Sequence, residues 1–373
     1  MTLSETRLQT LLNRITAEDF PGIAVAVGKG NNIIWQGTAG YADMTREVNI
    51  TPETRFGIGS ITKVFIAVII LQLTEEGLLT LDAPLSRWLE KACLAGIANA
   101  DKVTLRQLLS HRAGIPSWEN EPSWIHAARG KSLDPTKIWQ PDENLAYIRG
   151  IAPLCRPGEA FHYSNTHFTL LGLLIERITL QGLREVLATR IFNRLALANT
   201  FMVVDPQTDS QGMSGKFHRA DDSFIKNAGV ADCFKRENKN LLNVSATNLT
   251  VEWAAGGIIS TSQDVLTFIL ALKNGQLLNA ASLNEMQNWI PADGAQMGLS
   301  LFRMNTTLGM ASGHGGNVLG FSASVWWYEK TDCAVAILTN VGTMYAHPSA
   351  SCASTLFREG KITKLAQEMC ALH

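Results

Sequence analysis

The sequence lacks most of the features that mark a specialised class of protein. Its longest apolar run, residues 64–73, contains Gln72 and is about half as long as a membrane crossing requires. The six cysteines form no C-x-x-C pair, and no histidine cluster has the spacing of a zinc site. We therefore expect no membrane-spanning helix, no metal and no cofactor, and we expect buried free thiols in preference to disulfides.

A surplus of charge is also missing. The 32 lysines and arginines and the 33 aspartates and glutamates are mixed along the chain and leave a formal net charge of −1. Nothing in this balance indicates a nucleic-acid or membrane partner, so a small-molecule substrate is expected, and the oligomeric state is left open. Residues 1–14 lack the basic start, apolar stretch and cleavage site of a secretory leader, which favours a cytoplasmic location, or a periplasmic one if a leader has been removed.

The composition and the order of secondary-structure patterns are those of a globular protein, with 46% apolar and 17% charged residues. Short runs rich in Val, Ile and Ala at residues 22–27 and 32–37 flank a glycine-containing turn, and the pattern returns at residues 322–328 and 334–339. Stretches with helical patterning lie between these strands and after the last one; they are residues 60–76, 105–110, 144–150, 166–179, 182–191, 262–273 and 349–359.

This order predicts an α+β fold, in which one antiparallel β-sheet from both termini is flanked by helices and carries an inserted all-helical domain. We expect residues 1–59 together with residues 290–373 to form the sheet domain. Residues 60–289 are expected to form a mainly helical domain. The active site should then lie at the interface of the two domains.

Ser60 and Lys63 form an S-x-x-K motif at the start of the apolar run. Residues three apart on a helix share one face, so the Lys63 amine can reach the Ser60 hydroxyl. The free N–H groups and the dipole of a helix N-terminus would favour an oxyanion there. Burial by the following apolar residues would lower the lysine pKa from about 10.4, so that it could accept the serine proton. The motif predicts a serine nucleophile with a lysine base; the alternative is a serine that only caps the helix.

The S-x-x-K spacing alone does not identify a nucleophile, because Ser223 and Lys226 repeat it. That copy follows Asp221 and Asp222 in a polar stretch without an apolar helix behind it, and we expect it to be a solvated loop. The interpretation of Ser60 therefore depends on partners elsewhere in the chain.

The first partner is Tyr163, which is followed two residues later by Asn165 where a loop opens a helix. A phenol beside an ammonium can pass the serine proton to the leaving group, and an amide can hold both the lysine and the substrate carbonyl. The alternative for Tyr163 is a buried tyrosine whose hydroxyl is satisfied by hydrogen bonds.

The second partner is a glycine-rich segment, His314, Gly315 and Gly316, just before the last two predicted strands. Glycines allow a substrate to approach the backbone closely. The N–H of Asn317 at a strand edge, together with the N–H of Ser60, could stabilise an oxyanion. Taken alone, the segment is more typical of an ordinary turn than of a binding site.

The three motifs, in this order along the chain, resemble the pattern of the class C β-lactamase and D-alanyl-D-alanine carboxypeptidase family, which also includes esterases and D-amino-acid amidases. The similarity continues over most of the chain, through residues 103–116, 157–176, 254–275 and 313–340. It implies a fold of the β-lactamase and transpeptidase type, no metal, an acyl-enzyme on Ser60, and a base system of Lys63 and Tyr163. The residues that it implies for substrate binding are Asn165, His314, Gly316 and Asn317.

The third motif departs from the family pattern in a way that bears on the substrate. Strict β-lactamases usually have K-T-G there, and its lysine and threonine engage the substrate carboxylate. His314 could still attract a carboxylate when cationic, but Gly315 offers no hydroxyl. We therefore expect a serine hydrolase of small amides or esters, with D-alanyl peptides or β-lactam-like compounds as the reference substrates. The alternatives are a carboxylesterase or D-amino-acid amidase, and a non-catalytic binding homologue.

Overall fold

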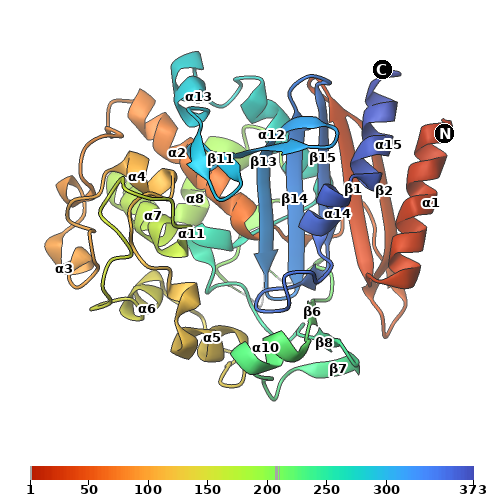
Figure 1. The fold of residues 1–373 in the computed structure, drawn as a ribbon, viewed down its shortest axis with the longest axis horizontal. Helices are drawn as coiled ribbons and strands as arrows, with labels where there is room; N and C mark the ends of the chain where they lie inside the picture. Colours follow the sequence, from red (N-terminus) through yellow and green to blue (C-terminus); the bar gives the residue numbers. More distant parts are fainter. Residues whose placement is uncertain (1, 206–208, 210) are drawn as a thin grey trace.

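A nine-stranded sheet organises the structure, a computed structural model that describes residues 2–205, 209 and 211–373. All of its strand pairings are antiparallel. From one edge to the other, the strands are β10 (Ile290–Ala292), β11 (Ala295–Met297), β12 (Phe302–Thr306), β13 (Gly309–Val318), β14 (Phe321–Tyr328), β15 (Cys333–Thr339), β1 (Gly22–Lys29), β2 (Asn32–Asp43) and β3 (Val48–Asn49). The predicted antiparallel sheet from both termini is confirmed (Figure 1).

Strands β1 and β15 join the two ends of the chain within this sheet. They pair in continuous register from Ile23 opposite Thr339 to Lys29 opposite Cys333. Apart from Lys29, every residue of both strands is buried. Since both faces of the sheet are covered, these strands are continuous apolar runs and do not alternate between apolar and polar residues.

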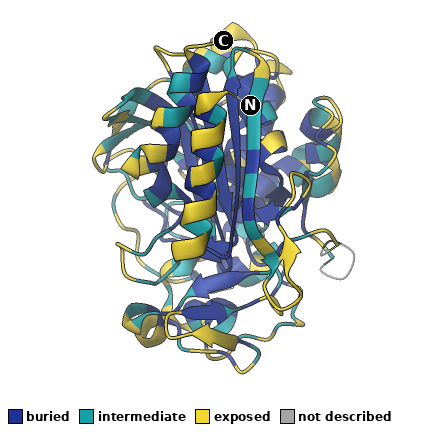
Figure 2. Cartoon of the chain, turned by 90° about the vertical axis from the view of Figure 1, so that its right-hand side faces the viewer, coloured by how far each residue is buried: buried dark blue, intermediate teal, exposed yellow. Residues whose placement is uncertain are grey.

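Helices from the two termini cover one face of the sheet, with the first and the last helix side by side (Figure 1). These helices are α1 (Leu3–Glu18), α14 (Ala353–Glu359) and α15 (Lys361–Cys370). The buried leucines of α1 are Leu8, Leu11 and Leu12, whereas its outer side is exposed to solvent (Figure 2). Helix α12 (Ser262–Lys273) packs on the opposite face, against β1, β2, β14 and β15.

Helix α2 (Thr62–Glu75) is the central element of the mainly helical part. Every residue from Thr62 to Leu73 is buried, so the longest apolar run of the sequence is a core helix. The other helices here are α3 (Lys91–Leu94), α4 (Leu105–Leu109), α5 (Pro122–Arg129), α6 (Pro141–Ala146), α7 (Asn165–Thr179), α8 (Leu183–Leu187), α10 (Asp222–Asn227), α11 (Trp253–Gly256) and α13 (Ala280–Met286). Within the described residues, none of the helices combines the length and apolar character that a membrane crossing needs.

Two small sheets interrupt the helical part, so the expectation of an all-helical insertion is wrong in detail. One sheet contains β4 (Phe56–Gly57), β9 (Ile258–Ser260) and β5 (Phe201–Met202). The other contains β16 (Val341–Gly342), β6 (Phe217–Arg219), β8 (Leu241–Asn243) and β7 (Lys235–Asn238). Strands of two to four residues are too short to show alternation in the sequence.

Three further expectations differ from the structure. The helix expected at residues 144–150 is α6, which ends at Ala146, and the stretch around Ser223 is the short helix α10 and not a loop. Helix α15 follows the helix that was expected to be last. The division into residues 1–59 with 290–373 and residues 60–289 remains a proposal, because α12 of the middle range packs directly on the sheet.

Candidate active site

Ser60 lies in a tight turn that touches strand β13. The turn is a short 3₁₀ helix, Gly59–Ile61 (η1), and α2 begins after it, so Ser60 precedes the α-helix. Gly59 has a φ of +52°, and a side chain there would come within 2.6 Å of the Asn317 nitrogen. A side chain at Gly316 would overlap the backbone just before the turn. The two glycines therefore allow the serine turn and the third motif to come into contact.

Lys63 is fully buried beside Ser60, one turn further along the chain. Its Nζ is 2.9 Å from the Ser60 Oγ and 2.7 Å from the carbonyl oxygen of Ala255. Burial lowers the pKa of Lys63 to about 8, although the Glu119 and Glu252 carboxylates oppose this shift. A lysine with this pKa has a useful neutral fraction near neutral pH, which a general base requires.

Tyr163 lies two residues before α7 and brings its ring to 5.1 Å from Lys63 Nζ. The ring stacks with His111 at a centroid distance of 4.1 Å and with Phe302 at 6.3 Å. Among the described residues its buried hydroxyl makes no hydrogen bond of normal geometry, although the Ser60 hydroxyl lies nearby. Burial raises the pKa of Tyr163 above its usual range, and the nearby Ser60 hydroxyl offsets this only in part. Tyr163 is therefore a neutral phenol, which suits it to relay a proton and not to act as a phenolate.

Asn165 is the first residue of α7, but its amide does not bind the lysine as expected. Its Nδ2 donates to the carboxylate of Glu119, and no hydrogen bond between Asn165 and Lys63 occurs in the described part of the chain. Its Oδ1 is buried and has no hydrogen-bond partner among the residues that the structure describes. Because Asn165 is buried and is not among the described residues that line the pocket around Ser60, its role in substrate binding stays a prediction.

His314, Gly315 and Gly316 lie inside β13 and not in a turn before the strands. The Nδ1 of His314 contacts the Gly315 carbonyl and must carry the proton, because a carbonyl oxygen only accepts. Burial lowers the pKa of His314 to about 3. The cationic histidine considered from the sequence is therefore wrong near neutral pH, and the motif offers a substrate carboxylate no positive charge.

The backbone nitrogens of Ser60 and Asn317 both lie at the contact between the serine turn and β13. A side chain at Gly316 would be 3.2 Å from the Ser60 nitrogen. A side chain at Gly59 would likewise crowd the Asn317 nitrogen, so both nitrogens lie where the turn and the strand touch. The side chain of Asn317 is held by Thr343: Asn317 Nδ2 donates to Thr343 Oγ1 over 2.7 Å, and the Thr343 N–H donates to Asn317 Oδ1 over 3.0 Å. The assignment of the two N–H groups as an oxyanion hole stays a prediction.

A pocket of about 590 Å³ opens over these groups. Ser60, Tyr163, His314 and Asn317 line it together with residues that the sequence motifs did not indicate, among them Glu119, Asp293, Phe302, Met304, Thr343 and Arg358. Glu119 lies three residues beyond the similar segment 103–116, and no motif marks it. In the described part of the chain, no group of three or more His, Cys, Asp or Glu side chains could hold a metal ion.

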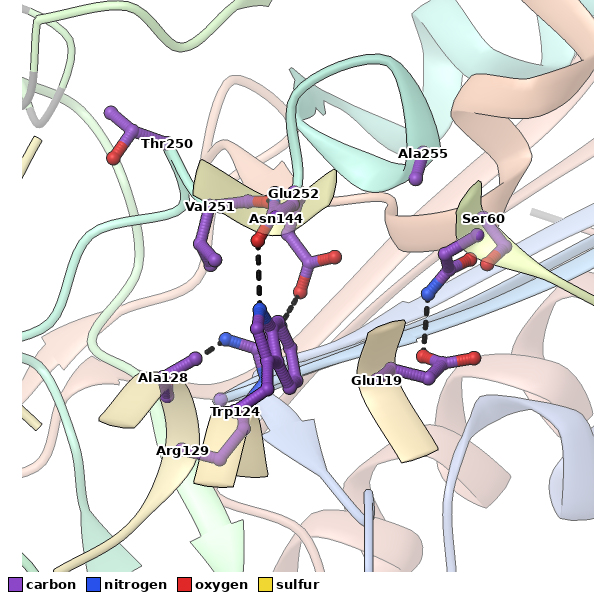
Figure 3. Close-up of polar contacts among 12 residues, drawn as sticks. Ser60, Glu119, Trp124, Ala128, Arg129, Asn144, Thr250, Val251, Glu252 and Ala255 are labelled. Carbon is purple, nitrogen blue, oxygen red and sulfur yellow. Dashed lines mark hydrogen bonds and ion pairs between the residues drawn. The ribbon is translucent and has the colours of Figure 1, made fainter. Parts of the chain in front are cut away.

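Next to the site, Arg129 and Glu252 form a buried ion pair (Figure 3). Their side chains are 1% and 3% exposed, and the Arg129 guanidinium lies 4.7 Å from the ring centre of Trp124. The Ala255 N–H donates to the backbone carbonyl of Glu252 over 2.9 Å. The ion pair therefore anchors the turn whose Ala255 carbonyl accepts from Lys63.

Comparisons with known proteins identify the family of this chain. A family model described as Beta-lactamase matches residues 8–348. The protein flp of Staphylococcus aureus (strain COL) is 27% identical over 198 residues, which are 53% of this chain and 38% of that protein. Penicillin-binding protein 4* of Bacillus subtilis (strain 168) is 29% identical over 187 residues, which are 50% of this chain and 39% of that protein. The matched region thus spans about two fifths of the length of these relatives.

Solved structures match over nearly the whole chain. A D-stereospecific amidohydrolase from Streptomyces sp. is 28% identical, with a TM-score of 0.76 over 91% of this chain and 94% of that chain. The D-amino acid amidase from Ochrobactrum anthropi SV3, complexed with D-phenylalanine, has a TM-score of 0.83 over 99% of this chain and 100% of that chain. Since that amidase is only 23% identical, its likeness concerns the fold. The expected fold class is confirmed.

Proposed function

The chain belongs to the beta-lactamase family, and we propose that it is a serine hydrolase that cleaves small amides through an acyl-enzyme on Ser60, preferring substrates with a free ammonium group. The observation that carries this preference is Glu119, which lines the same pocket as Ser60. The third motif is neutral, because His314 is uncharged. A neutral motif offers no charge to a substrate carboxylate, whereas Glu119 offers a charge to a substrate ammonium. Amino-acid amides therefore suit the pocket better than substrates that carry a carboxylate. The name of the Ochrobactrum neighbour, a D-amino acid amidase, favours D-amino-acid amides as the class, and the name of the Streptomyces neighbour, a D-stereospecific amidohydrolase, is compatible with it.

Glu119 has the surroundings of a binding carboxylate. Burial raises the pKa of Glu119 above its usual range, and the nearby Lys63 and the Asn165 amide, which donates to the carboxylate, offset that rise only in part. An opposite charge close to a carboxylate favours ionisation. A substrate ammonium entering the pocket would therefore stabilise the Glu119 anion and be bound by it.

Acylation starts from the neutral form of Lys63. The Ser60 Oγ attacks the amide carbon, its proton passes to Lys63 Nζ, and the N–H groups of Ser60 and Asn317 stabilise the oxyanion of the tetrahedral intermediate. The proton then moves through the Tyr163 hydroxyl to the leaving nitrogen. The C–N bond breaks, ammonia or an amine leaves, and the acyl group remains on Ser60 as an ester.

Deacylation repeats the same proton movements with water as the nucleophile. Water attacks the ester carbon and gives a proton to the base system of Lys63 and Tyr163. The ester C–O bond then breaks, and Ser60 recovers its proton as the carboxylic acid product leaves. Each cycle consumes one amide and one water and restores the enzyme.

A second candidate is a carboxypeptidase that acts on D-alanyl peptides. It is favoured by Arg358, which is exposed on α14 and lines the pocket, so that its guanidinium could pair with a terminal carboxylate. A carboxylesterase needs neither Glu119 nor Arg358. A cytoplasmic location, or a periplasmic one after removal of a leader, is part of the proposal.

The test compares D-phenylalaninamide with 3-phenylpropionamide, which lacks only the ammonium, and adds an acetylated D-alanyl-D-alanine peptide, nitrocefin and a p-nitrophenyl ester. We expect the highest kcat/KM among the amides for D-phenylalaninamide. Glu119→Gln should reduce that value about 10-fold or more, the range of a lost charge pair. It should leave hydrolysis of the neutral ester unaffected at a pH high enough for Lys63 to be neutral in both proteins.

Arg358→Met is the matched control, because it removes a charge from the same pocket and should affect only the peptide. Equal kcat/KM values for the two amides in the wild type would contradict the ammonium preference. If mass spectrometry finds no adduct on Ser60 after treatment with a fluorophosphonate, the non-catalytic alternative holds.

A further inference from the structure

The segment that follows β16 crosses from one side of the pocket to the other. Thr343 and Met344 line the pocket, and both they and Tyr345 are half-buried. The segment contacts both the strand that carries Asn317 and the turn that carries Glu119. These two contacts reach groups with different tasks in the proposed function.

On one side, Thr343 and Asn317 are joined by two hydrogen bonds in opposite directions. The Asn317 amide donates to the threonine hydroxyl over 2.7 Å, and the backbone N–H of Thr343 donates to the Asn317 side-chain oxygen over 3.0 Å. A residue held at both its donor and its acceptor has little freedom to rotate. The backbone N–H of Asn317 is thereby fixed relative to the serine turn, which an oxyanion donor requires.

On the other side, the Tyr345 hydroxyl donates to the backbone carbonyl of Glu119 over 2.7 Å. Tyr345 has a φ of +63°, a left-handed conformation that costs a non-glycine residue free energy. The surrounding structure holds this conformation, and it brings the phenol to the turn that carries Glu119. The contact fixes the backbone from which the Glu119 carboxylate extends.

The segment has firm anchors of its own. Val341 and Gly342 pair in parallel with Phe217 and His218 of β6. The Nε2 of the buried His218 is 2.9 Å from the Met344 carbonyl oxygen. This carbonyl can only accept, so Nε2 donates the proton. The backbone between Thr343 and Tyr345 is thus held from behind by a buried strand.

We propose that Thr343 and Tyr345 are positioning residues with separate tasks: Thr343 holds the Asn317 oxyanion donor and so acts on every substrate, whereas Tyr345 holds Glu119 and so acts only on substrates with an ammonium. This inference rests on the proposed function. It adds a division of labour between the two residues: a change at Thr343 should lower kcat for every substrate, and a change at Tyr345 should raise KM only for substrates with an ammonium.

The experiment uses the full chain with Thr343→Val, Thr343→Ser and Tyr345→Phe. Valine keeps the shape and the backbone N–H but loses the hydroxyl acceptor, whereas serine keeps it. Thr343→Val loosens the oxyanion donor, the Asn317 N–H, without removing it. We therefore expect kcat to fall about 10-fold on both D-phenylalaninamide and the p-nitrophenyl ester. Outright loss of an oxyanion donor would lower kcat about 100-fold or more. Thr343→Ser should restore most of the rate.

Tyr345→Phe should raise KM for D-phenylalaninamide several-fold and leave the kinetics of the ester unchanged. The matched controls are Thr179→Val, whose hydroxyl donates to the Ile175 carbonyl at the end of α7, and Tyr147→Phe, whose ring packs near Trp139. Each control variant loses the same hydroxyl group as its counterpart, but outside the pocket, and should change neither kcat nor KM.

Hydrogen exchange measured by mass spectrometry tests the proposal without turnover. Peptides that cover residues 309–321 should exchange faster in Thr343→Val than in the wild type, and peptides that cover residues 117–121 should exchange faster in Tyr345→Phe. Unchanged exchange in both regions would overturn the positioning roles. Equal effects of Tyr345→Phe on amide and ester would overturn the division of labour. Failure of the proposed function is a different result, in which the wild type hydrolyses neither substrate while the exchange differences persist.

Discussion

The Lys63 ammonium lies 2.9 Å from the Ser60 hydroxyl, and the same nitrogen donates to the Ala255 carbonyl over 2.7 Å. The carbonyl can accept from either charge state of the amine, so Lys63 stays oriented toward Ser60 before and after it takes up a proton. Ala255 belongs to the turn that the Arg129–Glu252 ion pair anchors. Reactivity at Ser60 therefore depends on groups from three separate parts of the chain.

Replacement of Ser60 by alanine should abolish turnover. Loss of a nucleophile in a serine hydrolase lowers kcat by a factor on the order of 10⁶, whereas the loss of one hydroxyl should leave the fold intact. Hydrolysis of a p-nitrophenyl ester and a thermal unfolding curve measure the two effects. Residual activity above about one hundredth of the wild type would exclude Ser60 as the nucleophile.

The rate of ester hydrolysis should rise with pH through about 8, where Lys63 loses its proton. The rate rises with pH because only neutral Lys63 accepts the Ser60 proton. Protonation of Lys63 below this pH therefore removes activity. The Glu119 carboxylate raises the pKa of Lys63, and Glu119→Gln should therefore shift the acidic limb to lower pH. A neutral ester is the proper substrate, because its own charge does not titrate. A shift to higher pH in this variant would contradict the electrostatic coupling.

Lys63→Ala is the companion variant to this pH profile. It should nearly abolish acylation and remove the limb near pH 8, because no base remains beside Ser60. Single-turnover labelling with a fluorophosphonate measures acylation directly. A kcat comparable with that of the wild type would refute the role of Lys63 as base.

Replacement of Arg129 by methionine should lower the free energy of unfolding by about 3–5 kcal/mol, because it leaves the Glu252 carboxylate buried and unpaired. The double variant Arg129→Met with Glu252→Gln removes both charges and should lose less stability than the single variant. Urea unfolding at pH 7 measures both. A double variant that is less stable than the single one would show that the unpaired Glu252 carboxylate is not the source of the lost stability.

Lys216 should make the stability of the protein depend on pH. Its side chain is 8% exposed, its ammonium donates to the Thr247 carbonyl, and burial lowers its pKa from 10.5 to about 8. Between these two values the unfolded chain holds a proton that the folded chain has lost, so stability rises with pH in this window. Lys216→Met should flatten this rise, as urea unfolding at pH 7.5 and pH 10 can measure. Lys63 titrates in the same pH window in the wild type and in Lys216→Met. The difference between the two proteins in the pH dependence of the free energy of unfolding therefore reports Lys216.

The sequence determined the elements whose signals are local. The strands that became β1, β14 and β15 could be predicted because buried strands read as continuous apolar runs between turn residues. Strand β2 is mostly half-buried and could be predicted because a glycine-containing turn joins it to β1. The spacing of Ser60 and Lys63 was sufficient to predict that they meet, because three residues along a helical turn bring two side chains to one face. The resemblance to a known family supplied Tyr163 and the third motif, which no local pattern could have joined to Ser60.

The tertiary structure alone decided which charges and contacts the pocket contains. Glu119 faces Asn165 because η3 (Trp118–Asn120) packs against the start of α7, and Thr343 meets Asn317 across 26 residues of sequence. The neutral state of His314 likewise follows from burial and not from the residue type. Periodicity reports which face of an element is buried, but dielectric surroundings and long-range pairs exist only once the sheet and helices are assembled. For this reason the sequence could propose Ser60 as the nucleophile, whereas the proposed preference among substrates depends on the fold.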